Sequence, residues 1–148
     1  MLDRRPNVAD LVAQGRLRPQ EPDLDALTVT LNLAARDLEA AAANEGRFAP
    51  WAETMLYEAG LRAARAIVMA AGYRIAADRG HVTAIDAADA LTDGRQHRIF
   101  VRLHRLRRRR HEFMYETAAD PGAQELATAR EDVVNLIALA RERIGQSK

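Results

Sequence analysis

Side chains that can act on phosphate are concentrated in one stretch of the sequence, RIFVRLHRLRRRRHEFMYET at 98–117. The apolar residues of this stretch recur mostly three or four positions apart, which predicts one face of an α-helix: Ile99, Leu103, Leu106 and Phe113. Arg110 fills the one gap in that series, so an arginine lies in an apolar stripe. His111 and Tyr115 are one helical turn apart on a neighbouring face. We therefore select Arg110, His111 and Tyr115 as candidate catalytic residues.

The guanidinium group of Arg110 is planar and permanently charged, so it can grip phosphate at a cleft or a subunit interface. The same spacing also fits a basic helix whose arginine packs its stem on the core and holds its head in water. Six further residues are candidate nucleic-acid contacts, four in this helix and two in a loop at 72–81: Arg105, Arg107, Arg108, Arg109, Arg74 and His81. That loop is either an ordinary connector or a ligand-contacting loop held by a rigid scaffold.

Several chemistries are excluded by composition and spacing. Without cysteine there is no disulfide, thiolate nucleophile or zinc–thiolate site, and serine occurs only at Ser147, which leaves a serine-hydrolase triad unsupported. His97, His104 and His111 are seven residues apart, roughly 10 Å along a helix, too far to share one metal ion. We expect no metal and no cofactor. Metal-free cleavage of RNA needs a base, an acid and a cation, and arginine, histidine and tyrosine supply some of these.

Length and composition predict one all-α domain. A chain of 148 residues can form one good core, and its apolar residues, 48% of the total, include many alanines, which favour close-packed helices over a sheet. The net charge is only +1, so positive charge is local and concentrated at 95–110. No apolar run approaches a membrane-spanning helix, and 1–20 lacks the apolar core of a signal peptide. We expect a soluble, cytoplasmic protein.

Capping residues and prolines mark the expected helices. The pattern predicts four principal helices plus short ones, with expected spans of 8–13, 24–44, 51–71, 83–91, 98–117 and 121–144. Asn7 and Asp23 cap the first two, Pro50 lies in the first turn of the third, and Thr83 with Asp86 forms a capping box. Asp120 and Pro121 open the last helix. The single domain spans 1–148, with a short helix and connector at 1–22 and a frayed tail at 145–148.

Four segments together resemble the HEPN superfamily, the small α-helical domains of toxin–antitoxin, phage-defence and RNA-processing systems, and in particular its compact actinobacterial members. These segments are DLVAQGRLRPQEPD before a helix ending in RDLEAA, the helix YEAGLRAARAIVMAAGYR, the GH after it, and RLRRRRHEFMYE. Together they span most of the chain. The resemblance implies an up-and-down bundle of four principal helices and a homodimer in which the basic helices face each other across a cleft.

The hallmark of the family is an arginine, a polar residue, and a histidine four to six positions after the arginine. The resemblance places Arg110 and His111 at the first two positions and Tyr115 at the histidine position. Tyrosine can donate a hydrogen bond or stack on a base, but its pKa near 10 makes it a poor general base. Arg105 with His111 matches the motif literally in another register, which would put the two residues on different sides of the helix.

Three functions follow as hypotheses. The leading one is an RNA- or nucleotide-binding protein; if it is a metal-independent endoribonuclease, Arg110 stabilises charge, His111 transfers a proton and Tyr115 positions the substrate. The second is a non-catalytic partner of a minimal nucleotidyltransferase or an antitoxin, which holds a nucleotide or presents Tyr115 for modification. The third is a structural homodimer whose arginines pair with acidic residues such as Glu53, Glu58 and Asp86.

Overall fold

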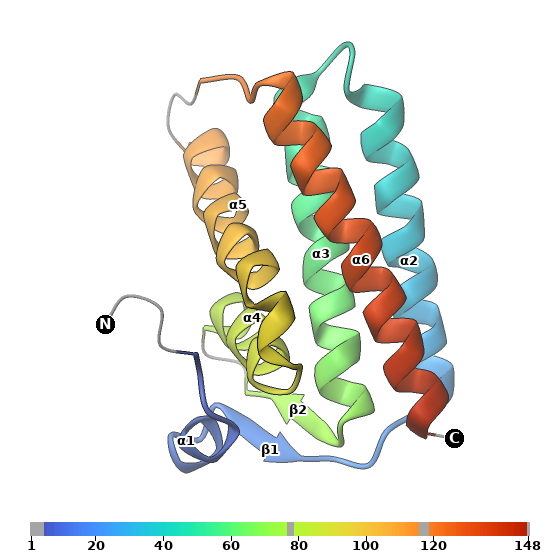
Figure 1. Cartoon of the computed structure of the whole chain (residues 1–148), viewed down its shortest axis with the longest axis vertical. Helices are drawn as coiled ribbons and strands as arrows, with labels where there is room; N and C mark the ends of the chain where they lie inside the picture. Colours follow the sequence, from blue (N-terminus) through green and yellow to red (C-terminus); the bar gives the residue numbers. More distant parts are fainter. Residues whose placement is uncertain (1–4, 77–78, 116–118, 148) are drawn as a thin grey trace.

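The computed structural model describes residues 5–76, 79–115 and 119–147 (Figure 1). This part of the chain is mostly helical, as composition predicts, with two short strands. Its elements are α1 (Val8–Ala13), β1 (Leu17–Pro19), α2 (Leu24–Asn44), α3 (Ala49–Ala70), β2 (Tyr73–Ile75), α4 (Gly80–Ala90), the 3-10 turn η1 (Gly94–Gln96), α5 (His97–Tyr115) and α6 (Ala123–Ser147). Among the described residues, no helix combines the length and apolar character needed to cross a membrane.

Local signals set most helix ends. The side chain of Asn7 accepts hydrogen bonds at the start of α1, and that of Asp23 accepts one from the Ala26 N–H at the start of α2, as predicted. Pro50 lies in the first turn of α3. Gly15 and Gly72 follow α1 and α3 with φ of 73° and 93°, left-handed conformations that glycine adopts without a steric penalty.

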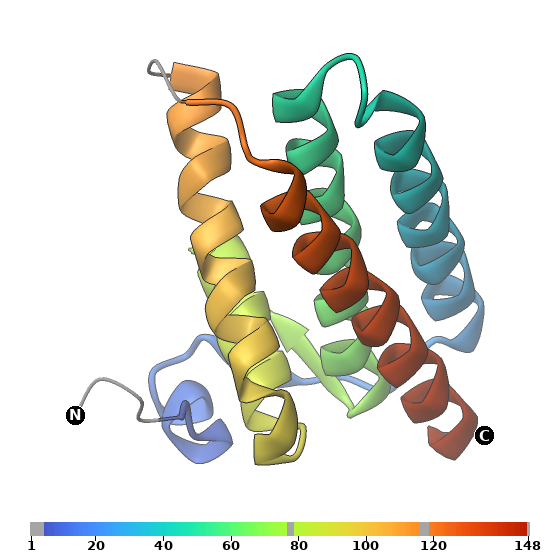
Figure 2. The ribbon, with the colours of Figure 1, turned by 45° about the horizontal axis from the view of Figure 1, so that its top comes forward.

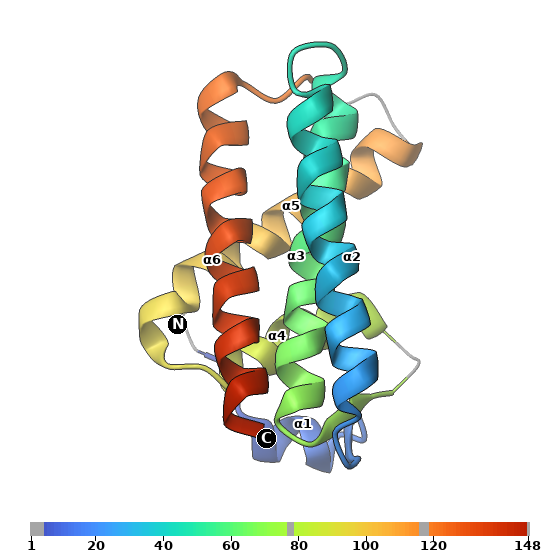
Figure 3. The ribbon, with the colours of Figure 1, turned by 90° about the vertical axis from the view of Figure 1, so that its right-hand side faces the viewer.

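The central helix is α3, which contacts α2, α4, α5 and α6. Many of its buried residues are alanines, so the neighbouring backbones approach closely. α5 also packs closely at Gly60, since a Cβ added there would lie 2.7 Å from Leu103 Cδ1. α2, α3 and α6 run side by side, whereas α5 crosses them at an angle and makes few contacts with α6 (Figure 3).

The buried face of α5 is rotated slightly from the predicted one. Phe100 and Leu103 are buried, whereas Ile99 and Leu106 are only partly buried. The predicted series omitted Phe100, although it precedes Leu103 by three positions, a spacing that fits a helical face as well as four does. With this face in the core, three of the arginines of α5 line a hollow beside the start of α4: Arg107, Arg108 and Arg110.

A two-stranded ladder was not predicted. β1 pairs with β2 in antiparallel register, with Leu17 opposite Ile75, inside the segments expected to be connectors. The ladder lies at the end of the molecule beside α1 and α4 (Figures 1 and 2). Three-residue strands carry too little alternation to be recognised from sequence. Because β1 and β2 are paired, the segment that follows α3 lies beside the segment that precedes α2.

Several expected boundaries were wrong. α4 begins at Gly80, so Thr83 is a buried residue inside the helix and its hydroxyl accepts a hydrogen bond from Arg16 Nε instead of capping. α6 begins at Ala123, two residues after the expected proline. The tail expected to fray continues α6 through position 147. The expected end of the basic helix at 117 lies outside the described residues.

Candidate functional site

A positively charged hollow lies between the start of α4 and the second half of α5. Its volume is about 630 Å³ and it is open to solvent. The start of α4 supplies one arginine and one histidine, and α5 supplies three arginines, one histidine and one glutamate. These charged or titratable lining residues are Arg79, His81, Arg107, Arg108, Arg110, His111 and Glu112. The structure therefore brings together four of the residues selected from the basic helix and the histidine selected from the loop.

Arg110 forms one wall of this hollow and is anchored from behind by α3. Its Nε lies 3.0 Å from Glu58 Oε1, and both side chains are 33% exposed. The pair is ionic only, because the buried Nε–H makes no hydrogen bond to any described residue. Glu58 thus explains why an arginine is tolerated in the apolar stripe, because its carboxylate balances the charge of Arg110.

His81 reaches the hollow from α4 and is held by a fully buried tyrosine on α3. Its Nδ1 lies 2.9 Å from the hydroxyl oxygen of Tyr57. Burial raises the pKa of Tyr57 to about 12, so its hydroxyl keeps its proton. The hydroxyl has no other hydrogen-bond partner in the described structure, so it must donate to Nδ1 or leave its proton unsatisfied. We therefore assign neutral His81 the tautomer with its proton on Nε2.

The surroundings of His81 keep it uncharged. Its pKa is lowered below 6.5, first by burial and then by Arg65 of α3, with smaller contributions from Arg110 and Arg107 of α5; Glu58 opposes this shift. At neutral pH, His81 therefore offers the hollow an N–H donor without charge. Nε2 makes no hydrogen bond within the described residues.

Three arginines leave their charge largely uncompensated around the hollow. Arg107 donates only a long hydrogen bond, 3.4 Å from its Nε to His104 Nδ1. Arg79 and Arg108 are exposed and form no ion pair with a described residue. Arg79 also has a φ of 54°, an uncommon left-handed conformation for a residue other than glycine. It occupies the N-cap position of α4 but makes no capping hydrogen bond through its side chain.

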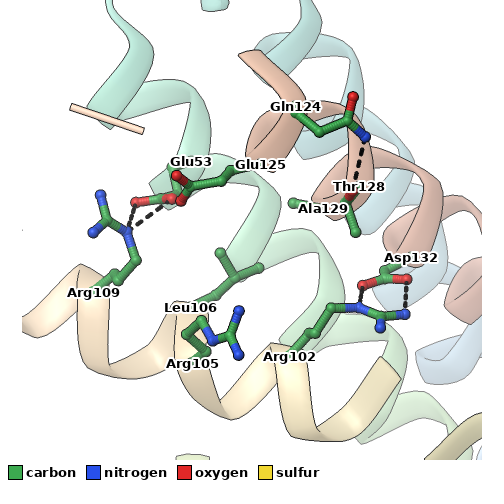
Figure 4. A pocket seen from close by; sticks show the side chains of 10 residues that line it. All are labelled: Glu53, Arg102, Arg105, Leu106, Arg109, Gln124, Glu125, Thr128, Ala129 and Asp132. Carbon is green, nitrogen blue, oxygen red and sulfur yellow. Dashed lines mark hydrogen bonds and ion pairs between the residues drawn. The ribbon is translucent and has the colours of Figure 1, made fainter. Parts of the chain in front are cut away.

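The other residues selected from the sequence lie elsewhere. Tyr115 is 74% exposed and does not line the hollow, although its ring lies 5.0 Å from that of His111. Arg74 lines a separate hollow with Gln20 and Arg65. Arg105 and Arg109 line a smaller hollow of about 170 Å³ between α5 and α6 (Figure 4).

Ion pairs hold this smaller hollow together. Arg109 Nε donates to both carboxylate oxygens of Glu53, at 2.9 and 3.0 Å, and Arg102 makes two hydrogen bonds to Asp132 at its other end (Figure 4). Burial raises the pKa of Glu53, although hydrogen bonding and charge from Arg109 oppose the rise. Because their carboxylate partners come from α3 and α6, Arg102 and Arg109 fasten α5 to the bundle.

All three carboxylates named in the third hypothesis pair with residues of α5: Glu53, Glu58 and Asp86. Asp86 of α4 lies 2.8 Å from His104 Nε2 and 3.0 Å from an Arg16 nitrogen. Burial alone would raise the pKa of Asp86, but the hydrogen bonds from His104 and Arg16 outweigh it and the pKa is lowered. Asp86 is therefore a folded-state anion that joins α4, α5 and the connector before β1.

Replacing Asp86 with alanine is expected to lower the free energy of unfolding by about 2 kcal/mol near pH 7, because two partly buried donors lose their acceptor. The lowered pKa of Asp86 means that its contribution is present above its ordinary value of 3.8 and is lost as pH falls through the folded-state value. Urea unfolding at pH 7 and near pH 3 measures this difference. An equal gap between wild type and variant at both pH values would contradict the assignment.

Tyr57 was missed as a site residue. It lies within the helix expected at 51–71 and is fully buried on α3. The available signal was its hydroxyl, which needs a partner when the ring is in the core. The identity of that partner depends on where α4 packs, which the sequence does not specify locally.

No group of three metal-ligating side chains converges within the described residues. The arginines and histidines that line the hollow between α4 and α5 supply N–H donors, which suit an anion. The chain matches no known family model, no curated protein and no solved structure. The resemblance to the HEPN superfamily accordingly stays a prediction.

Proposed function

We propose that this protein binds the phosphate groups of RNA or a nucleotide in the hollow between α4 and α5. The observation that carries the proposal is the convergence of Arg79, Arg107, Arg108 and Arg110 on one space, where Glu112 is the single acidic residue among the described lining residues. Arginine is suited to this task because its planar fork makes two parallel hydrogen bonds to phosphate oxygens.

The size and openness of the hollow agree with such a ligand. Its volume of about 630 Å³ lies within the usual range for ligand sites, roughly 300 to 1,000 Å³. The Nε2–H of His81, which also lines the hollow, adds an uncharged donor beside the arginines. Since the net charge of the whole chain is only +1, attraction to a polyanion has to come from a local cluster of positive charge such as this one.

Fluorescence anisotropy with a labelled single-stranded RNA tests the proposal. We expect binding that weakens as salt rises, with a slope of about 0.7 per neutralised phosphate on logarithmic axes. A contribution from two or three phosphates corresponds to roughly 1.5 to 2 in that slope. Absence of binding to RNA and to nucleotides at low salt would overturn the proposal.

A metal-independent endoribonuclease is the second candidate function. It is favoured by Arg110 and His111 lining the same hollow, where they could stabilise phosphorane charge and transfer a proton. In this version Tyr115, one turn beyond His111, positions the substrate by stacking or hydrogen bonding.

Cleavage of RNA in EDTA distinguishes this candidate from simple binding. We expect an active enzyme to lose at least about 100-fold in rate in both Arg110→Ala and His111→Ala, since each role contributes roughly that much. Arg105→Ala is the control, because Arg105 lies on the other hollow. If both variants still cleave RNA at the wild-type rate, His111 and Arg110 are not catalytic.

We also propose that the fold is a HEPN-like bundle that forms a homodimer through the basic helix. A partner protein of the nucleotidyltransferase or antitoxin type is a further part of this proposal. The 74% exposure of Tyr115 favours a role in which its hydroxyl is presented to a partner protein. Light scattering measures the dimer directly. A monomer at micromolar concentration would contradict the proposal of a cleft between two subunits.

A further inference from the structure

The charges around the hollow between α4 and α5 do not cancel. Four arginines line it, while the acidic side chains are Glu112 in the lining and Glu58 behind Arg110. Counted over the described residues, two positive charges are therefore left uncompensated. His81 does not add to them at neutral pH, because burial and the neighbouring arginines lower its pKa.

An internal phosphodiester brings one negative charge to such a site, whereas a phosphate monoester brings about two at pH 7 because its second pKa is near 6. A monoester also presents three terminal oxygens, each a strong acceptor. The open hollow has guanidinium donors on both walls, from Arg79 on the α4 side and from Arg107, Arg108 and Arg110 on α5. Donors on opposite walls can reach several oxygens of one terminal phosphate at once.

We infer that the hollow is a phosphate monoester site, which takes a nucleoside monophosphate or the phosphorylated end of an RNA, with His81 as an uncharged donor to a phosphate oxygen. This inference rests on the proposed function, because it narrows which phosphate is bound. Tyr57 is the positioning residue: its buried hydroxyl occupies His81 Nδ1, which leaves the Nε2–H as the donor that this hollow-lining imidazole can offer to a ligand. A neutral imidazole with its proton on Nε2 cannot accept a proton there, so the tautomer suits binding.

The ligand test compares four probes at pH 7.5: AMP, adenosine, and one short RNA carrying either a 5′-phosphate or a 5′-hydroxyl group. We expect AMP to bind by calorimetry and adenosine not to bind, and the phosphorylated RNA to bind at least tenfold more tightly than the hydroxyl form. The same RNA with a 3′-phosphate tells whether either end is accepted, and AMP binding without any preference between the RNAs assigns the site to free nucleotides.

The outcomes separate the two proposals. Equal affinity for phosphorylated and unphosphorylated RNA, together with no binding of AMP, would overturn the monoester inference and leave RNA binding intact. Failure of every probe to bind would overturn both. Inorganic phosphate should compete with AMP, because the recognised group is the terminal phosphate and not the base.

Two variants test the role of His81 and its tautomer. His81→Ala is expected to reduce AMP affinity at least fivefold, and Tyr57→Phe at least threefold, because the imidazole can then turn or change tautomer. Arg105→Ala, on the other hollow, should leave AMP affinity unchanged.

Nitrogen-15 spectra of the His81 imidazole provide a readout that a purely structural role would not change. In the wild type Nδ1 should be unprotonated and Nε2 protonated, and AMP should shift Nε2. A proton on Nδ1 at neutral pH would overturn the assignment.

Discussion

Arg108→Glu is expected to lower the affinity for single-stranded RNA by about 30- to 100-fold at low salt. The change removes one phosphate contact and adds a repulsive charge, for an assumed total of roughly 2 to 3 kcal/mol, and each 1.4 kcal/mol is a factor of ten. Arg108 is exposed and forms no ion pair with a described residue, so its substitution should leave the fold unchanged. Anisotropy titrations measure the affinity, and circular dichroism checks the helix content.

Arg105→Glu is the matched control for this experiment. Arg105 is also exposed and unpaired within the described structure, and it lies on the same helix three residues earlier, but it borders the smaller hollow of Figure 4. The total charge changes by the same amount in both variants. We expect Arg105→Glu to lower affinity by no more than about threefold, the effect of net charge alone. Equal losses in the two variants would mean that RNA contacts α5 without regard to the hollow.

Phe100→Ala is expected to cost about 3 to 5 kcal/mol of unfolding free energy. Phe100 is fully buried and, with Leu103, forms the part of α5 that enters the core. Removal of its ring leaves a cavity that the surrounding side chains fill only partly. Urea unfolding followed by circular dichroism measures the loss. RNA affinity should fall as well, because α5 carries most of the arginines of the hollow.

Val101→Ala serves as the comparison, since Val101 is the next residue on α5 and is 43% exposed. Its replacement should change stability by about 0.5 kcal/mol or less. A loss of similar size in the two variants would contradict the observed register of α5. The register decides which arginines face α4, so this result would also remove the structural basis of the hollow.

Signals within a few residues of one another were enough to predict much of the fold. Asn7 and Asp23 cap their helices as expected because capping is a local hydrogen bond between a side chain and the next turn. Arg110 was identified by its position in an apolar stripe, which proved to reflect a charged partner on α3.

The grouping of the site residues could not be predicted, because it depends on tertiary pairing. Arg107 to Arg110 are consecutive in sequence, yet Arg109 turns to Glu53 and the smaller hollow while its neighbours face α4. His81 joins them only because α4 packs against α3 and α5, and Tyr57 fixes its ring from a third helix. The capping box at Thr83 failed for a similar reason, since the short strand ladder and the packing of α4 override a local preference.

The most direct test of a phosphate site between α4 and α5 is a titration of nitrogen-15-labelled protein with AMP, followed by nuclear magnetic resonance. We predict that the shifts concentrate on the side chains and amides of His81, Arg107, Arg108 and Arg110. Saturable shifts centred on Arg105, Arg109 and Gln124 would place the ligand in the other hollow. The absence of any saturable shift would contradict the account that these arginines form a phosphate site.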